Sequence, residues 1–437
     1  MTIRLGRSYA LLWTASALSY IGDGILITAS PLLVLSLTSE PMVVAAAEVA
    51  LTLPYLLFGI IGGVVVDRLD RRRLMVTLDF ARAVLLLLVL ISLSFDVVQI
   101  PVLLCTLFLL TTADTVFRTA AQTALPSIVP KEGLVKANAR LMSAEIVGAQ
   151  FAGPALGGLL FAGAVALPFL ANGVSFALSG LLLLLALPAR RATRAASEAA
   201  EPGTAPGPFR AGVLKEAAEG VRWLWTQSTL RFLAASSATI NFFTGATNAI
   251  LVLYVHQVLH LSNAAFGLVV ACGAAGGVIA GMVAGRVATK FGTRNSLVFA
   301  VALQAVGQGI LFVSSNTVLT VLALACAGFA MVQFSSVSVA LRQSTIPDHL
   351  LGRATSVYRM LAWGSLPLGA LTAGLAVTWT GIRSTFALGA VVLTALTFWV
   401  LLRSSDYGLG DAKESDEPAP SPEPKSGTGS NLPQETS

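Results

Sequence analysis

Long apolar runs follow one another along most of the chain, separated by short polar segments. Runs long enough to cross the ~30 Å hydrocarbon core of a bilayer lie near residues 9–38, 41–66, 74–94, 99–120, 138–163 and 165–188, and again near 229–257, 263–288, 295–314, 317–340, 354–378 and 382–402. A helix satisfies its backbone hydrogen bonds within one segment, as lipid requires. The pattern predicts an all-α membrane protein with twelve transmembrane helices in two groups of six.

Two polar segments divide the chain further. Residues 189–228 hold several arginines and a run of prolines and glycines, and are expected to form a cytoplasmic linker between two lobes. Within them, 213–225 has the spacing of an amphipathic helix lying on the membrane surface. Residues 403–437, with seven acidic residues and alternating prolines, are expected to be a disordered cytoplasmic tail. The predicted lobes are therefore residues 1–188 and 229–402.

Composition and charge narrow the class of protein. Only 11% of the residues are charged and 55% are hydrophobic, whereas soluble domains have about 25% charged residues. The net charge of +6 comes from short basic clusters without a nucleic-acid motif. Of the 28 basic residues, only Arg383 lies in a loop on the opposite side. Positively charged loops stay in the cytoplasm, so we expect a multi-pass protein of the cell (cytoplasmic) membrane with both termini cytoplasmic.

The two halves repeat each other at an offset of about 217 to 223 residues. Gly22 in span 1 falls on Gly245 in span 7, and the loop from Gly63 to Arg72 falls on the loop from Gly285 to Arg294. Such repeats are typical of transporters whose two lobes enclose a site near the midplane. The sequence thus predicts two pseudo-symmetric six-helix lobes around a central cavity.

Three runs carry a resemblance to a known family. The loop Gly63-Val-Val-Val-Asp-Arg-Leu-Asp-Arg-Arg72 is similar to G-x-x-x-D-R-x-G-R-R, with Asp70 at the second glycine and Thr289 where the second-half copy often has an acid. Residues 148–158 end in Gly-Pro-Ala-Leu-Gly-Gly, and span 1 contains Ile-Gly-Asp-Gly at 21–24. Residues from about 5 to 402 resemble the major facilitator superfamily, in its branch of drug/proton antiporters that includes macrolide and enterobactin exporters.

The resemblance implies a conformational latch at the cytoplasmic end of span 2. There Asp67 would face the N-terminus of span 11, whose helix dipole favours a carboxylate, and the contact would break as the lobes rock. Asp114 and Arg118, one turn apart, would complete a charge relay with Arg71. The alternative is a basic loop that only sets topology. The latch set is Gly63, Asp67, Arg68, Arg71, Arg72, Asp114 and Arg118.

Three acids within spans are candidates for proton coupling. Asp23 lies near the middle of span 1 between two glycines, where we expect a local break in the helix. Burial disfavours the charged carboxylate, so Asp23 would exchange a proton as the cavity opens to either side. The alternative is an acid that permanently caps a half-helix. Glu48 and Glu145, each about two turns inside its span, are further proton sites or packed neutral acids.

The remaining candidates are structural or line a substrate cavity. Asp79 and Arg82, at i and i+3, are expected to form a structural pair at the membrane interface. The resemblance implies that the span 5 motif bends its helix and prevents proton leakage, which is compatible with close packing by small residues; it comprises Gly148, Gly153, Pro154, Gly157 and Gly158. Arg359 pairs with an acid of the first lobe or reaches back to the interface. The expected substrate cavity contains Tyr20, Asn241, Phe242, Phe243, Gln333 and Arg359.

Motifs for other functions are missing from the sequence. It has no phosphate-binding loop of the G-x-x-x-x-G-K-[ST] type and no protease, lipase or metal motif. We therefore expect no enzyme activity and no cofactor, with the proton gradient as driving force. The expected function is proton-coupled efflux of small hydrophobic or amphiphilic compounds by a monomer whose partners are substrate, protons and the lipid bilayer. A siderophore or metabolite exporter, an importer and a non-transporting sensor remain the alternatives.

Overall fold

The computed structural model describes residues 5–95, 97–186, 222 and 225–403, and these residues are helical apart from short connections. The predicted linker helix at 213–225 and the predicted tail at 403–437 lie almost wholly outside them. The helices are α1 (Arg7–Leu37), α2 (Pro41–Arg68), α3 (Arg71–Ser94), α4 (Ile100–Ile128), η1 (Lys131–Gly133), α5 (Leu134–Glu145), η2 (Ile146–Ala152), α6 (Gly153–Gly163), α7 (Leu167–Ala186), α10 (Ser228–Gln257), α11 (Asn263–Val313), α12 (Thr317–Thr345), α13 (Asp348–Thr380) and α14 (Ile382–Arg403).

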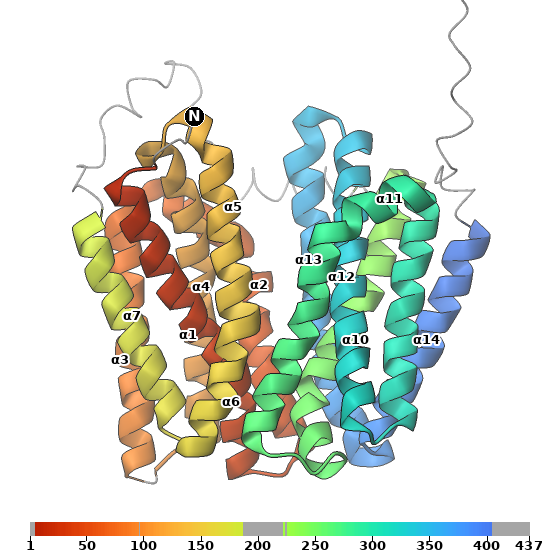
Figure 1. The fold of residues 1–437 in the computed structure, drawn as a ribbon, viewed down its shortest axis with the longest axis horizontal. Coiled ribbons are helices and arrows are strands. Elements are labelled where there is room, and N and C mark those ends of the chain that lie inside the picture. Colours follow the sequence, from red (N-terminus) through yellow and green to blue (C-terminus); the bar gives the residue numbers. More distant parts are fainter. Residues whose placement is uncertain (1–4, 96, 187–221, 223–224, 404–437) are drawn as a thin grey trace, which may run out of the picture.

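The described residues contain eleven candidate membrane spans, one of which is a double span. Helix α11 has 51 residues, far more than the ~20 that cross a bilayer. Its backbone leaves the helical region at Gly292, where φ is 77°, a conformation that glycine adopts without steric cost. The chain reverses there in Figure 1. The two arms match the predicted spans 263–288 and 295–314, so the all-α fold class is confirmed.

The repeated loops turn in two different ways. In the second half, Gly292 provides the positive φ. In the first half its counterpart is Asp70, whose φ is −64° and whose carboxylate caps α3 by accepting a hydrogen bond from the backbone N–H of Arg73 at 2.9 Å. An N-cap aspartate stabilises a helix start. The replacement of glycine by Asp70 is therefore accommodated by a capped turn.

The helices form two groups, α1–α7 (the N-terminal lobe) and α10–α14 (the C-terminal lobe), which stand side by side in Figure 1. Both described ends of the chain lie at the same end of the molecule. At the opposite end the lobes pack together through α6 against α11 and α2 against α13. An added Cβ at Gly158 would lie 2.8 Å from the Cα of Gly267, so these backbones are in direct contact across the lobes.

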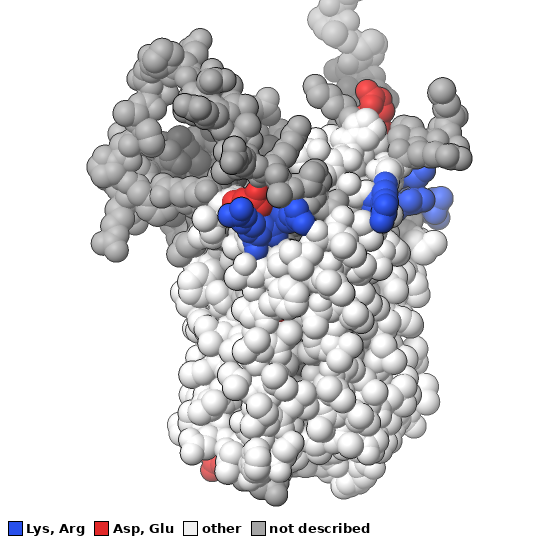
Figure 2. Space-filling model, turned by 90° about the vertical axis from the view of Figure 1, so that its left-hand side faces the viewer, with Lys and Arg blue, Asp and Glu red and all other residues white. Residues whose placement is uncertain are grey.

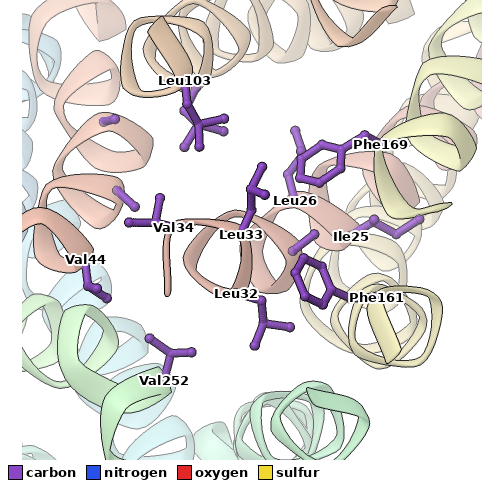
Figure 3. Packing of buried hydrophobic residues seen from close by; sticks show 14 of the residues in the cluster. Ile25, Leu26, Leu32, Leu33, Val34, Val44, Leu103, Phe161, Phe169 and Val252 are labelled. Carbon is purple, nitrogen blue, oxygen red and sulfur yellow. The ribbon is translucent and has the colours of Figure 1, made fainter. Parts of the chain in front are cut away.

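Helix α1 is the centre of the N-terminal lobe. Figure 3 shows its apolar residues Ile25 to Val34 packed on several sides, against Leu103 of α4, Phe161 of α6 and Val252 of α10. Of the residues in its most apolar stretch, 67% are buried inside the protein, whereas the corresponding share is 28% in α14 at the periphery. A helix buried all round has no polar face. A charged residue on α1 therefore needs protein partners.

Span 5 contains a π-helical segment. It comprises α5, η2 and α6, and η2 is a π-helix of seven residues. The backbone N–H of Gly153 bonds to the carbonyl of Gly148, five residues back. Proline has no N–H and its ring clashes with the carbonyl four residues earlier, and Pro154 follows directly. A widened turn accommodates this ring, and such segments are frequent at functional sites.

Charge is distributed unevenly along the molecule. Figure 2 shows Lys and Arg gathered toward one end, whereas the white surface below them carries few charged residues. This is the end at which the described chain begins and ends (Figure 1). The uncharged part of the surface is the part that lipid would contact.

Candidate functional site

Two cavities lie between the lobes, each with a volume of about 260 Å³. The first, which we call the acidic cavity, is bordered mainly by α1, α2 and α4, and the second, the amide cavity, by α10, α11 and α12. Residues Ile27, Asn248 and Leu251 border both cavities, so the two adjoin. Polar groups of the acidic cavity are Asp23, Glu48, Thr52, Tyr55, Thr111, Asp114, Arg118 and Asn248.

Arg118 joins carboxylates from three spans at the wall of the acidic cavity. Its Nε donates to Asp114 at 2.6 Å, and its Nη1 donates to Glu145 at 2.5 Å. Its Nη2 lies 3.6 Å from Oδ2 of Asp23. The guanidinium also lies over the ring of Tyr20, 4.8 Å from its centroid. The planar guanidinium has donors in several directions, which suits contact with α1, α4 and α5 at once.

Arg82 of α3 forms a second centre behind the first. Its Nη1 lies 3.3 Å from Asp23 and 3.8 Å from Asp114, and its Nη2 bonds to Asp79 and to Ser19. Asp79 in turn accepts a hydrogen bond from Ser179 of α7 at 2.6 Å. Asp79 and Arg82 are fully buried. The expected pairing of these two residues is confirmed, but the expected location at the membrane interface is wrong, because both side chains and their partners lie inside the lobe.

The cluster formed by Asp23, Asp79, Arg82, Asp114, Arg118 and Glu145 contains four carboxyl groups and two guanidinium groups. When all are ionised it has an excess of negative charge, which is unfavourable in a medium of low dielectric constant. Protonation of two of the four carboxyl groups would remove this excess charge. Each guanidinium group would still have one carboxylate partner. Asp23 contacts both guanidinium groups and borders the cavity.

The span 5 glycines hold that span against α1 on both sides of Asp23. An added Cβ at Gly153 would lie 2.5 Å from the Cα of Gly24, and one at Gly157 would lie 2.7 Å from the carbonyl oxygen of Ile25. The backbones pass this closely because glycine has no side chain. Helix α1 runs without interruption from Arg7 to Leu37, so the expected break at Asp23 is wrong. Its glycines are needed for close approach rather than for a kink.

Glu48 lies apart from this cluster. It is on α2 and borders the acidic cavity, where its Oε1 accepts a hydrogen bond from Nδ2 of Asn248 on α10 at 3.3 Å. The bond therefore crosses from one lobe to the other. Among the described residues, no lysine or arginine forms an ion pair with Glu48.

The amide cavity has a neutral polar wall. Gln308 donates to Thr247 at 2.8 Å, and Gln304 lies 3.5 Å from Thr244. These threonines and Asn248 follow one face of α10, at i, i+3 and i+4. Gln304 is 97% buried, and its Oε1 has no hydrogen-bond donor among the described residues. Gln304 therefore brings an unpaired acceptor to the border of the amide cavity.

The six predicted substrate residues do not border either cavity. Tyr20 is buried beneath Arg118, and Asn241 bonds back to Ser237 at 2.8 Å. Phe243 packs in the C-terminal core with Phe242 against it, while Gln333 is fully buried. We correct this prediction, because the cavity-facing stripe of α10 begins one turn later, at Thr244. Arg359 is exposed and lies over Trp363, 5.5 Å from its centroid.

An aromatic contact links this arginine to the charge cluster. Trp363 of α13 meets Tyr55 of α2 edge to face, with ring centroids 6.2 Å apart. The hydroxyl of Tyr55 donates to Asp114 at 2.8 Å. A contact between the lobes thus reaches the cluster through Tyr55, which the sequence analysis did not single out.

The predicted latch residues separate into two places. Asp114 and Arg118 lie in the cluster at mid-span and do not contact Arg71, so the predicted relay is wrong. Arg71 donates to the carbonyl of Thr123 at 2.8 Å, and Arg72 bonds to the carbonyl of Leu184. Both arginines tie the start of α3 to neighbouring helices. The side chains of Asp67 and Arg68, and the surroundings of Gly63, lie outside the described residues.

Comparison with known proteins decides the family. A family model described as "Transmembrane secretion effector" (MFS_3) matches residues 5–426. The chain belongs to this family of the major facilitator superfamily. The multidrug efflux pump Tap of Mycolicibacterium fortuitum is 26% identical over 372 residues, covering 84% of this chain and 88% of that protein. Tap of Mycobacterium tuberculosis H37Rv is 25% identical over 429 residues, covering 94% and 97%.

Solved structures share the fold. The nucleoside transporter NupG superimposes with a TM-score of 0.73 at 14% identity, covering 91% of this chain and 99% of that chain. The protein is therefore a multi-pass secondary transporter of the major facilitator fold, and the predicted family, fold class and absence of an enzymatic role are confirmed.

Proposed function

We propose that the protein exports small hydrophobic or amphiphilic compounds in exchange for protons, by alternating access of the central cavity. The observation that carries this proposal is the contact of Arg118 with carboxyl groups from three spans at the cavity wall. In this mechanism a proton moves on and off the cluster through Asp23, which both guanidinium groups contact. The names of the Tap relatives support efflux of drugs as the direction and substrate class.

The coupling works through the balance of charge. A protonated Asp23 releases part of its attraction for Arg82 and Arg118, whereas an ionised Asp23 holds the two guanidinium groups together. Span 5 packs on α1 at Gly24 and also carries Glu145, so a rearrangement of these contacts moves a span that forms the lobe interface. Protons and the driving gradient take the place of a cofactor in this proposal.

We further propose that the protein lies in the cytoplasmic membrane as a functional monomer with both termini in the cytoplasm. The basic end of the molecule in Figure 2 supports this orientation, since positively charged segments stay on the cytoplasmic side. The contacts of α6 with α11 then close the outer end. The cavities would be reached from the cytoplasm in this state, as an exporter requires for loading.

The test measures how much of a macrolide, a hydrophobic cation and a siderophore accumulates in efflux-deficient cells. The cells produce either the wild-type protein or the Asp23→Asn variant. Wild type should lower accumulation of at least one compound, and both a protonophore and Asp23→Asn should abolish the difference. The amount of protein in the membrane is measured alongside. Export that survives Asp23→Asn but stops with the protonophore would remove Asp23 from the coupling path. No export of any compound would contradict the proposed function.

A further inference from the structure

Glu48, the acid at the cavity wall that lies outside the charge cluster, has surroundings unlike those of Asp23 and Asp114. Asp23 and Asp114 contact guanidinium groups, whereas the Glu48 side chain accepts a hydrogen bond from the neutral amide of Asn248. A carboxylate at this depth is costly without a positive partner. Its place is at the border of the acidic cavity, near Thr52 and Leu51.

We propose that Glu48 anchors a binding subsite for an organic cation, separate from the proton-carrying cluster. The cationic group of the ligand would take the place of the Asn248 amide beside Oε1, and Thr52 and Leu51 would border it. Proton exchange at Asp23 and cation binding at Glu48 are then tasks of different residues. The proposal deepens the proposed export function, because it names the class of compound that this cavity selects.

The neighbouring cavity fits the rest of such a ligand. The acidic and amide cavities adjoin at Asn248, and together they reach the size of sites that hold drug-sized molecules, roughly 300–1,000 Å³. Leu251 and Val270 line both, so an apolar body can extend past them. At the far wall the buried Oε1 of Gln304 has no donor among the described residues. A donor group on the ligand would satisfy it.

The position of Glu48 also connects cation binding with movement of the lobes. Its hydrogen bond to Asn248 joins α2 to α10. A cation that pairs with Glu48 competes for the same oxygen and so removes one contact that holds the lobes together. A cation also neutralises the charge of the Glu48 carboxylate at this depth, which the neutral amide of Asn248 does not.

Equilibrium binding to purified protein in lipid nanodiscs tests the subsite without a proton gradient. The probes are tetraphenylphosphonium and ethidium, which are cations, and chloramphenicol, which is neutral. The variant is Glu48→Gln, which keeps the shape of the side chain and removes its charge. The matched control is Glu40→Gln, because Glu40 is exposed in the connection between α1 and α2.

We expect both cations to bind wild type and Glu40→Gln equally, and Glu48→Gln about tenfold or more weakly, as for loss of one partner of a partly buried charge pair. Chloramphenicol binding should not change. Asn248→Lys, which places a tethered ammonium beside Glu48, should weaken cation binding in the same way and decides the matter if Glu48→Gln does not fold. Wild-type protein that binds neither cation, or variants that bind them as wild type does, would overturn the subsite. Proton-dependent export in cells would still stand in that case.

Discussion

Replacement of Gly153 by alanine tests the close contact between span 5 and the helix that carries Asp23. The new Cβ would lie 2.5 Å from the Cα of Gly24 and 2.6 Å from the carbonyl oxygen of Gly148. Carbon atoms in contact prefer about 3.5–4.0 Å, so the two backbones must separate by roughly 1 Å. Both neighbours are backbone atoms, which have no rotamer to change. Such overpacking costs about 1–3 kcal/mol.

Gly281→Ala is the matched control, because no heavy atom lies within 4 Å of an added Cβ there. Alanine favours a helix over glycine by up to about 1 kcal/mol at either position, so the difference between the two variants isolates the steric cost. The assay is thermal unfolding in detergent, followed by tryptophan fluorescence, with export measured in cells. We expect Gly153→Ala to melt below wild type and to export less, and Gly281→Ala to match or exceed wild type. Equal melting temperatures for the two variants would refute the close contact.

Three further predictions concern other contacts. Arg118→Lys should abolish export although it keeps the positive charge, because one ammonium cannot reach Asp114 and Glu145 with the geometry of a guanidinium. An accumulation assay checks this, with Arg359→Lys as the control variant that should export normally. Tyr55→Phe removes the hydrogen bond to Asp114 and should slow export. Normal export rates in this variant would show that the bond has no role in transport. Tyr254→Phe loses the hydrogen bond to the carbonyl of Ser314 at 2.6 Å and should lower the free energy of unfolding by about 1 kcal/mol. Chemical denaturation measures this change, and an unchanged midpoint would disprove it.

Much of the fold follows from the sequence because bilayer thickness fixes the length of an apolar run. The sequence predicts two separate spans within α11, because Lys290 and Arg294 interrupt the apolar pattern where the chain reverses. Helix ends were harder to place: α4 continues to Ile128, beyond the expected end near 120. Its last two turns are amphipathic rather than apolar, and hydropathy alone does not detect such extensions.

The sequence predicts part of the candidate site. It indicates Asp23, Glu145, Asp114 and Arg118 as charged residues within spans, but periodicity does not show which helices are neighbours. The pairing of Glu145 with Arg118 depends on the π-helical turn before Gly153, which sets the direction in which α5 faces. The sequence pairs Arg82 with Asp79 but does not indicate its contacts with Asp23 and Asp114. Its spacing of three from Asp79 indicated a local pair, whereas its position in the middle of α3 was the signal for a buried role.

The most direct test of the central claim is exchange of substrate for protons in proteoliposomes. Vesicles with an acidic lumen and an enclosed pH-sensitive dye receive a compound that wild type exports from cells. The account predicts a rise in lumen pH on addition of the compound to wild-type vesicles, because each inward substrate step releases protons outward. Vesicles with Asp23→Asn should show only the slow leak seen without compound. Substrate uptake by wild-type protein without any change in lumen pH would contradict proton coupling.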